Sequence, residues 1–202
     1  YMVKSGLVDD PRVSQYRLAA HLGLAFLLFG LMFWTGLGML QPRNAKFAVS
    51  PAPTLTKRLG NWLVPLVFVM VLSGALVAGI RAGLAYNTFP LMNGHFLPPE
   101  SFMVDPWWLN FFTNMATVQF DHRLIAWALM GLIPWYSWRI WNESPAARTP
   151  AVVLTLWLAV QVTLGVATLL LQVPVALGAT HQAGAMVLFG LLLWANHAIR
   201  RA

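Results

Sequence analysis

Three histidines each stand at the head of the same repeated segment. The segments read HLGLAFLLFGLMFW from His21, HRLIAWALMGLIPW from His122 and HQAGAMVLFGLLLW from His181. Counted from the histidine, all three have Ala at the fourth following position, Leu at the seventh, Gly at the ninth, Leu at the tenth and Trp at the thirteenth. Identities at fixed offsets indicate an internal repeat. An imidazole can bind iron, so the repeat predicts metal-ligand chemistry at up to three positions.

The spacing has a physical meaning on a helix. The fourth following residue lies one turn along on the same face, so Ala126 and Ala185 would leave a flat recess beside His122 and His181. A porphyrin ring needs such a recess. The Trp of each segment lies roughly 20 Å further along the axis. We therefore expect the histidines near one membrane face and the tryptophans near the other, where aromatic belts lie.

The composition is that of a membrane protein. Of 202 residues, 58% are hydrophobic and only 9% are charged, and the mean hydropathy is +0.64. A soluble domain has about a quarter charged residues. The chain has no cysteine, which excludes disulfides and thiolate metal sites. The formal net charge of +7 fits basic membrane-flanking loops, and no basic stretch is dense enough to favour nucleic acid.

The hydropathy pattern predicts an all-α integral membrane protein with five transmembrane helices. The expected spans are 18–40, 62–80, 120–141, 151–173 and 177–198, each about 20 residues long. Residues 1–17 are expected to form an extracytoplasmic loop after a helix that this chain lacks, because the chain begins with Tyr and with a polar stretch. Residues 41–61 form the first inner loop. Residues 62–202 form a four-helix unit with an outer lid at 81–119.

Basic residues predict the orientation. One side carries eight of them and a single acid, Glu143; the basic residues are Arg43, Lys46, Lys57, Arg58, Arg139, Arg148, Arg200 and Arg201. The other side carries five basic and five acidic residues. By the positive-inside rule, the first side and the C-terminus face the cytoplasm, or the matrix in a mitochondrion.

His122 and His181 are predicted to be the axial ligands of a b-type haem. Their helices run in the same direction, and both histidines lie within about one turn of the outer end, so they would face each other across a bundle. The alternative is that they are interfacial or packing histidines, but ionisable residues inside a membrane are rare and usually functional. His21 has no such partner in the chain. His95 and His197 do not fit the repeat and are expected to be solvated or structural.

Polar neighbours of these histidines are candidates for supporting roles. Arg123 and Arg81 could pair with haem propionates, and the alternative is that they bind lipid phosphates at helix ends. Asp121 and Gln119 are candidates for a hydrogen bond to the outer ring nitrogen of a ligand histidine, which would fix its tautomer.

Several segments resemble the haem A synthase family. They are YRLAAHLGL at 16–24, GIRAGLAYNTFPLM at 79–92, MATVQFDHRLIAW at 115–127, QVTLGVAT at 161–168 and THQAG at 180–184. The resemblance implies eight helices in two four-helix halves. Residues 18–40 would be the last helix of the substrate-haem half, and 62–202 would be the whole second half.

The resemblance also implies site roles. It implies a haem b between His122 and His181, and a substrate haem o in the first half, where a porphyrin methyl group is oxidised to a formyl group to give haem a. His21 would be one ligand of that substrate haem. Its partner and the acidic residue of the family would lie on helices outside this chain. With no cysteine in the lid, the chain resembles the cysteine-free branch, which leaves the electron route open.

The expected function is that of a haem-modifying oxidoreductase for cytochrome oxidase assembly, with the catalytic half only partly present. The alternative is a non-catalytic membrane cytochrome b subunit; the unpaired His21 favours the enzyme, since a carrier would pair its ligands. A transporter lacks support, because no broken helix is evident. Expected partners are haem o, the lipid bilayer, haem O synthase and an electron-acceptor protein, with oligomers possible and no nucleic acid. The expected location is the bacterial cytoplasmic or the mitochondrial inner membrane.

Overall fold

Five long helices make up most of the chain. The computed structural model describes residues 14–40 and 54–201, and the expectations for the loops at 1–13 and 41–53 lie outside this range. The long helices are α1 (Gln15–Leu40), α2 (Thr54–Gly79), α5 (Met115–Glu143), α6 (Arg148–Leu170) and α7 (Val175–Arg201), and the short ones are α3 (Ala82–Ala85), η2 (Trp107–Leu109), α4 (Asn110–Thr113) and η3 (Pro145–Ala147). Within this range the only β pairing is an isolated bridge between Met92 and His95.

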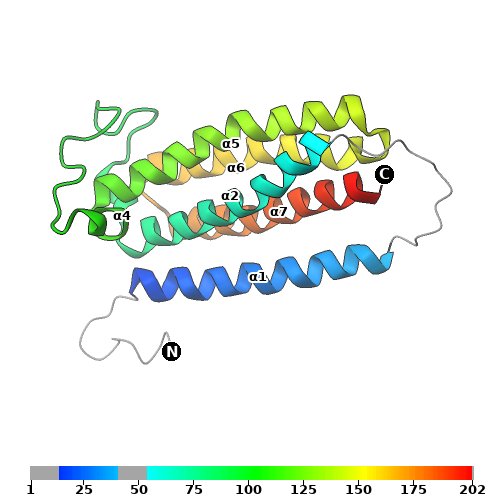
Figure 1. The fold of residues 1–202 in the computed structure, drawn as a ribbon. Helices are drawn as coiled ribbons and strands as arrows, with labels where there is room; N and C mark the ends of the chain where they lie inside the picture. The colour runs from blue at the N-terminus through cyan, green and yellow to red at the C-terminus, as the bar shows by residue number, and fades with distance from the viewer. Residues whose placement is uncertain (1–13, 41–53, 202) are drawn as a thin grey trace.

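Four of the long helices form a ring, and the fifth lies against it. α2 packs on α5, α5 on α6, α6 on α7, and α7 on α2, so that α5 and α7 occupy opposite corners. α1 packs on the edge made by α2 and α7 (Figure 1). α1, α5 and α7 run in one direction and α2 and α6 in the other. The three repeated segments therefore begin at the same end of the bundle.

The protein is an all-α integral membrane protein. α1, α2, the stretch Pro145–Leu170 and α7 are each long and apolar enough to cross a bilayer. α5 does not meet that test, although it is the longest helix at 29 residues and lies between α2 and α6 in the ring. Its mean hydropathy is lowered by polar groups at both ends, Asp121, His122 and Arg123 at one and Arg139 and Glu143 at the other.

All five long helices begin earlier than the sequence predicts, and the difference is largest for α2 and α5. α2 starts at Thr54, so the last residues of the expected 41–61 loop are helical. α5 starts at Met115 because the side-chain oxygen of Asn114 accepts hydrogen bonds from the backbone N–H groups of Ala116 and Thr117, as a helix N-cap does. The lid is correspondingly shorter than 81–119.

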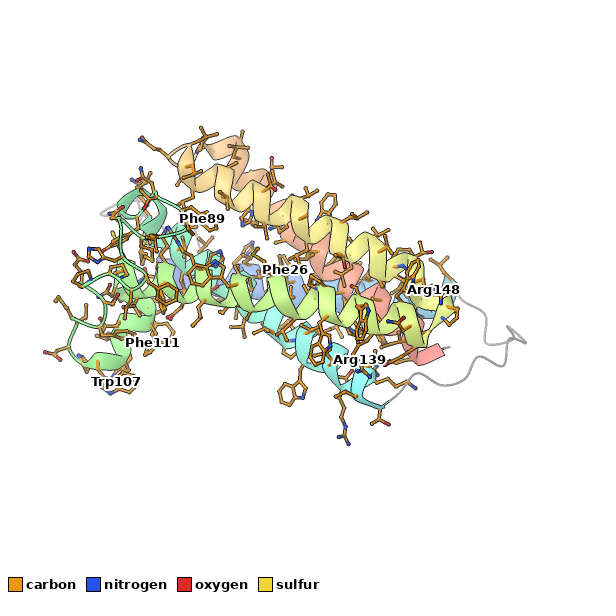
Figure 2. All side chains as sticks on the ribbon, turned by 90° about the horizontal axis from the view of Figure 1, so that it is seen from above. Phe26, Phe89, Trp107, Phe111, Arg139 and Arg148 are labelled. Atoms are coloured by element: carbon orange, nitrogen blue, oxygen red, sulfur yellow. The ribbon has the colours of Figure 1, made fainter. Side chains whose placement is uncertain are left out.

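The bundle has a densely packed hydrophobic core. Side chains from all five long helices are almost fully buried there: Phe26, Leu63, Val67, Leu129, Ile133, Tyr136, Ile140, Leu154, Leu192 and Ile199. At the end of the bundle away from the lid, Arg139 pairs with Glu143 and donates from Nε to the Thr56 hydroxyl at 2.9 Å, and that hydroxyl donates to Glu143. This network ties α2 to α5 at the end opposite the lid. Figure 2 shows Arg139 and Arg148 at that end and Trp107 and Phe111 at the lid end.

Candidate haem-binding site

His122 is fixed in one orientation by the neighbouring helix. Its Nδ1 atom lies 2.8 Å from the Oγ atom of Ser73 on α2. The Ser73 hydroxyl donates its proton to the carbonyl oxygen of Met70 at 2.8 Å, so towards the imidazole it acts as an acceptor. Nδ1 of His122 therefore carries the ring proton. The lone pair on Nε2 is left free, as an iron ligand requires.

His181 occupies the matching place on α7. The Gln161 side chain on α6 donates from Nε2 to the backbone carbonyl of His181 at 2.9 Å and lies 3.2 Å from its Nδ1. Gln161 is buried, and the indole N–H of Trp157 donates to the Gly184 carbonyl at 2.9 Å beside it. α6 therefore holds the His181 turn of α7 through both its backbone and its ring.

Two glycines make room for the two imidazoles. A Cβ atom at Gly74 would lie 3.2 Å from Cε1 of His122, and a Cβ atom at Gly165 would lie 2.8 Å from Cε1 of His181. Real Cβ atoms essentially never approach a neighbour within 3.0 Å. The Cε1 edge of each ring therefore lies close to a helix backbone, and an added Cβ atom would clash at Gly165 and be tight at Gly74.

The two histidines face the same interior from opposite corners. α5 and α7 do not pack on each other but are bridged by α2 and α6. Ala126 and Ala185 follow one turn along, both half-buried, and Ala185 packs against the hydrophobic core. The end of the bundle that holds the imidazoles is thus lined by small residues.

The supporting residues differ from those predicted. The expectation that Gln119 or Asp121 would hold a ligand histidine is wrong, because Ser73 and Gln161 do so. Gln119 donates instead to the carbonyl of Tyr86 in the lid at 2.8 Å, and Asp121 lines a cavity between α2 and α5. Ser73, Gly74, Gln161 and Gly165 were missed because they lie on the two helices without the repeat, where a single Ser or Gln gives no periodic signal.

Arg123 is buried beneath the lid. Its NH1 atom donates to the carbonyls of Pro90 at 3.1 Å and Leu91 at 3.3 Å, and its NH2 atom donates to that of Tyr86 at 3.0 Å. Tyr86 in turn donates from its hydroxyl to Glu100 at 3.1 Å. Burial and this hydrogen bond raise the pKa of Tyr86 above its ordinary value. Arg123 thus anchors the segment that closes the histidine end of the bundle.

Arg81 follows the lid end of α2 and is exposed, in the left-handed conformation with a φ of 56°. A contact of Arg81 or Arg123 with a propionate stays a prediction.

The remaining histidines are separate from this pair. His21 is exposed on α1. The exposed side chains of Leu24, Leu28 and Leu31 lie on the same face of α1, which points away from the ring of four helices. His95 is exposed in the lid. His197 is buried near the C-terminal end of α7 and packs edge-on against Trp34, with ring centroids 5.1 Å apart. His95 and His197 thus have the solvated and structural settings predicted for them.

The donor set suits a haem better than a bare metal ion. Among residues 14–40 and 54–201, no three His, Cys, Asp or Glu side chains gather to hold an ion. Two imidazoles, one from α5 and one from α7, would supply two of the six ligands of a haem iron, and the porphyrin would supply the other four. The glycines and alanines around them offer the flat surroundings that such a ring needs. The residues present therefore fit a haem.

Comparisons with known proteins also point to proteins that act on haem. A family model described as "COX15-CtaA: Cytochrome oxidase assembly protein" matches residues 1–193. The Heme A synthase of Nitrosospira multiformis is 59% identical over 100% of this chain and 57% of its own length. That of Nitrosomonas eutropha is 50% identical over 96% of this chain and 55% of its own length. Heme A synthase COX15 of Bos taurus is 42% identical over 100% of this chain and 50% of its own length.

The chain spans about half the length of the curated relatives that it matches. No solved structure matches it. The match to the family model nevertheless covers nearly every residue, from the His21 segment through both histidines of the bundle. The chain belongs to the COX15-CtaA family of cytochrome oxidase assembly proteins.

Proposed function

We propose that this chain forms the haem b-binding part of a haem A synthase, which converts haem o to haem a. The observation that carries the proposal is the pair His122 and His181 on diagonal corners of the bundle, each with Nδ1 beside a polar group of the next helix. When bound, a haem would supply one-electron redox chemistry.

The chain's own residues would orient such a haem and keep water away from it. Ser73 holds the His122 ring with Nε2 free, and Gln161 fixes the His181 turn. Gly74 and Gly165 let both rings lie against helix backbones. Arg123 ties down the lid over this end. These are the outer contacts that orient a ligand and set its basicity.

His21 is proposed to bind the substrate, haem o. The support is its place at the head of the third repeated segment and its exposure on a face that the described helices do not cover. The second ligand and the carboxylate that the family resemblance implies would lie outside this chain. The activity therefore belongs to the whole protein.

We further propose that the C-terminus faces the cytoplasm or the matrix. Arg139 and Arg148 lie at the end opposite the lid (Figure 2), and Arg200 of α7 donates to Asn61 near the start of α2 at 2.6 Å. The positive-inside rule expects such basic residues on the inner side. The membrane would be the bacterial cytoplasmic or the mitochondrial inner membrane, with haem O synthase and an electron acceptor as partners on the pathway.

A chimaera tests the proposal. This chain would replace the matching region of the Nitrosospira multiformis Heme A synthase, and haem would be extracted from the membranes and chromatographed. The chimaera should make haem a, and His21→Ala should abolish haem a while leaving the bis-imidazole haem b spectrum intact. A chimaera that folds and carries haem b but makes no haem a would favour the alternative, a non-catalytic cytochrome b.

A further inference from the structure

A cavity of about 380 Å³ lies between α2 and α5, on the far side of Ser73 from His122. Its walls are almost wholly apolar and come from α2, α5 and the lid helix α4: Val69, Leu72, Ser73, Leu76, Phe111, Phe112, Val118, Asp121, Leu124 and Ile125. Val69 and Leu124 are each 47% exposed on the surface of the bundle. The cavity therefore opens sideways towards lipid, and its occupant must be lipid-soluble.

Two polar groups interrupt this apolar wall, and both accept hydrogen bonds. The Asp121 carboxyl group is half-buried and has no hydrogen-bond or ion-pair partner among the described residues. A carboxyl oxygen accepts hydrogen bonds in either protonation state. Ser73 has already donated its proton to Met70, so its remaining lone pair can only accept. A buried acceptor without a donor is costly, which favours a ligand that brings hydroxyl groups.

Aromatic side chains set the shape of the ligand. Phe111 and Phe112 close the lid side of the cavity, and both rings belong to a wider aromatic cluster: Phe111 with Trp107 and Phe102, Phe112 with Tyr16. Aromatic faces favour a flat ring over a flexible acyl chain. Combined with hydroxyl donors and access from lipid, this describes one chemical class.

We propose that this cavity binds the ring of a membrane hydroquinone, a lipid-soluble quinol. One ring hydroxyl donates to the Asp121 carboxyl group and the ring lies beside Phe111 and Phe112, with the isoprenoid tail leaving between Val69 and Leu124. Ser73 is shared by this cavity and by His122, so the bound ring lies one side chain away from the imidazole. Quinol binding at this cavity can be measured whether or not the protein converts haem o, so the two proposals can fail separately.

Binding of decylubiquinol tests the proposal. The purified chain would be placed in nanodiscs of quinone-free phospholipid under anaerobic conditions, and binding would be measured by equilibrium partitioning. Saturable binding at one site per chain is expected, with decanol failing to compete. Leu124→Trp, which fills the cavity, should abolish the saturable component.

A second groove offers a matched control. It lies between α5 and α6 and is lined by Pro134, Ser137, Trp138, Trp141, Val152, Thr155 and Leu156. Leu156→Trp adds the same bulk to a lipid-facing leucine and should leave binding unchanged. Asp121→Leu should weaken binding about tenfold, the effect of losing one hydrogen bond to a buried group. Asp121→Asn keeps an acceptor oxygen and should retain most of the affinity.

Two results would overturn the proposal. One is saturable decylubiquinol binding that survives Leu124→Trp, which would place the ligand elsewhere. The other is equal competition by decanol, which would mean that the cavity takes only an acyl chain. A variant that loses its circular dichroism melting transition is replaced in the series by Ile125→Phe, which obstructs the same cavity from a less exposed position.

Discussion

The ring of His122 and the hydroxyl of Ser73 are joined by a 2.8 Å contact between Nδ1 and Oγ, across the packed pair of helices α5 and α2. Because the Ser73 hydroxyl donates to Met70, this contact selects the tautomer in which Nε2 is unprotonated. The orientation of the proposed iron ligand is thus set by a residue on a helix that carries none of the repeated histidines.

Replacing Ser73 by Ala should lower haem affinity about 10- to 100-fold, the usual effect of losing a hydrogen bond to a ligand histidine. The reduction potential of the bound haem should shift as well. Haem titration and potentiometry measure the two effects. Ser137→Ala removes another buried hydroxyl of the bundle, far from the histidines, and should change neither. Equal effects of both substitutions would mean that the Ser73 contact has no special role.

Replacing Gly165 by Ala should displace the His181 ring, because the new Cβ would lie 2.8 Å from Cε1. Overpacking costs about 1–3 kcal/mol, which corresponds to about a 5- to 150-fold loss of haem affinity if the strain falls on the ligated state. Gly178→Ala is the control, since nothing lies within 4 Å of its added Cβ. A Gly165 variant that binds haem as well as the Gly178 variant does would contradict the packing that we describe.

Replacing Arg123 by Gln should loosen the lid. The substitution removes donors to three backbone carbonyls, those of Tyr86, Pro90 and Leu91. Hydrogen–deuterium exchange should become faster around residues 86–92, whereas Arg200→Gln, at the opposite end, should leave that exchange unchanged. If exchange in the lid stays slow but haem is lost, Arg123 acts on the propionates and not on the lid.

The lid should also loosen in alkali. The pKa of Tyr86 is raised above 10.0 by burial and by its hydrogen bond to Glu100, so the folded state favours the neutral phenol. The resulting stabilisation is complete below the ordinary pKa and is lost as the pH rises through the folded value. The protection factors of the lid amides, which are corrected for base-catalysed exchange, should therefore fall above pH ~10, and Tyr86→Phe should remove this fall. An identical pH profile in the Tyr86→Phe protein would exclude Tyr86 as the cause.

The repeat predicts that His122 and His181 lie near the same end of the bundle, and in the structure their helices run in the same direction (Figure 1). His122 and His181 carry a signal in the sequence because Ala, Gly and Trp recur at fixed distances after each. Ser73, Gly74, Gln161 and Gly165 carry none, because their importance comes from which helix faces which, and that depends on the ring order of α2, α5, α6 and α7. Arg123 was identified, but its bonds to the lid could not be foreseen, since they depend on how the loop folds back.

The exact ends of the helices could not be predicted from hydropathy, because they depend on local capping contacts. The start of α5 depends on the Asn114 cap, and hydropathy does not reveal it. The polar residues Asp121, His122 and Arg123, which belong to the candidate site or lie beside it, also lower the mean hydropathy of α5. Hydropathy predicts five spans, whereas four helices of the described residues are long and apolar enough to cross a membrane, and α5 is not among them.

The central claim is that His122 and His181 bind one haem between them, and electron paramagnetic resonance of the purified, haem-loaded chain tests it most directly. The wild-type chain should give the low-spin signal of bis-imidazole iron with one haem per chain. His122→Ala and His181→Ala should each abolish that signal, whereas His95→Ala and His197→Ala should keep it. A His122→Ala/His181→Ala double variant that retains the low-spin signal would contradict the account.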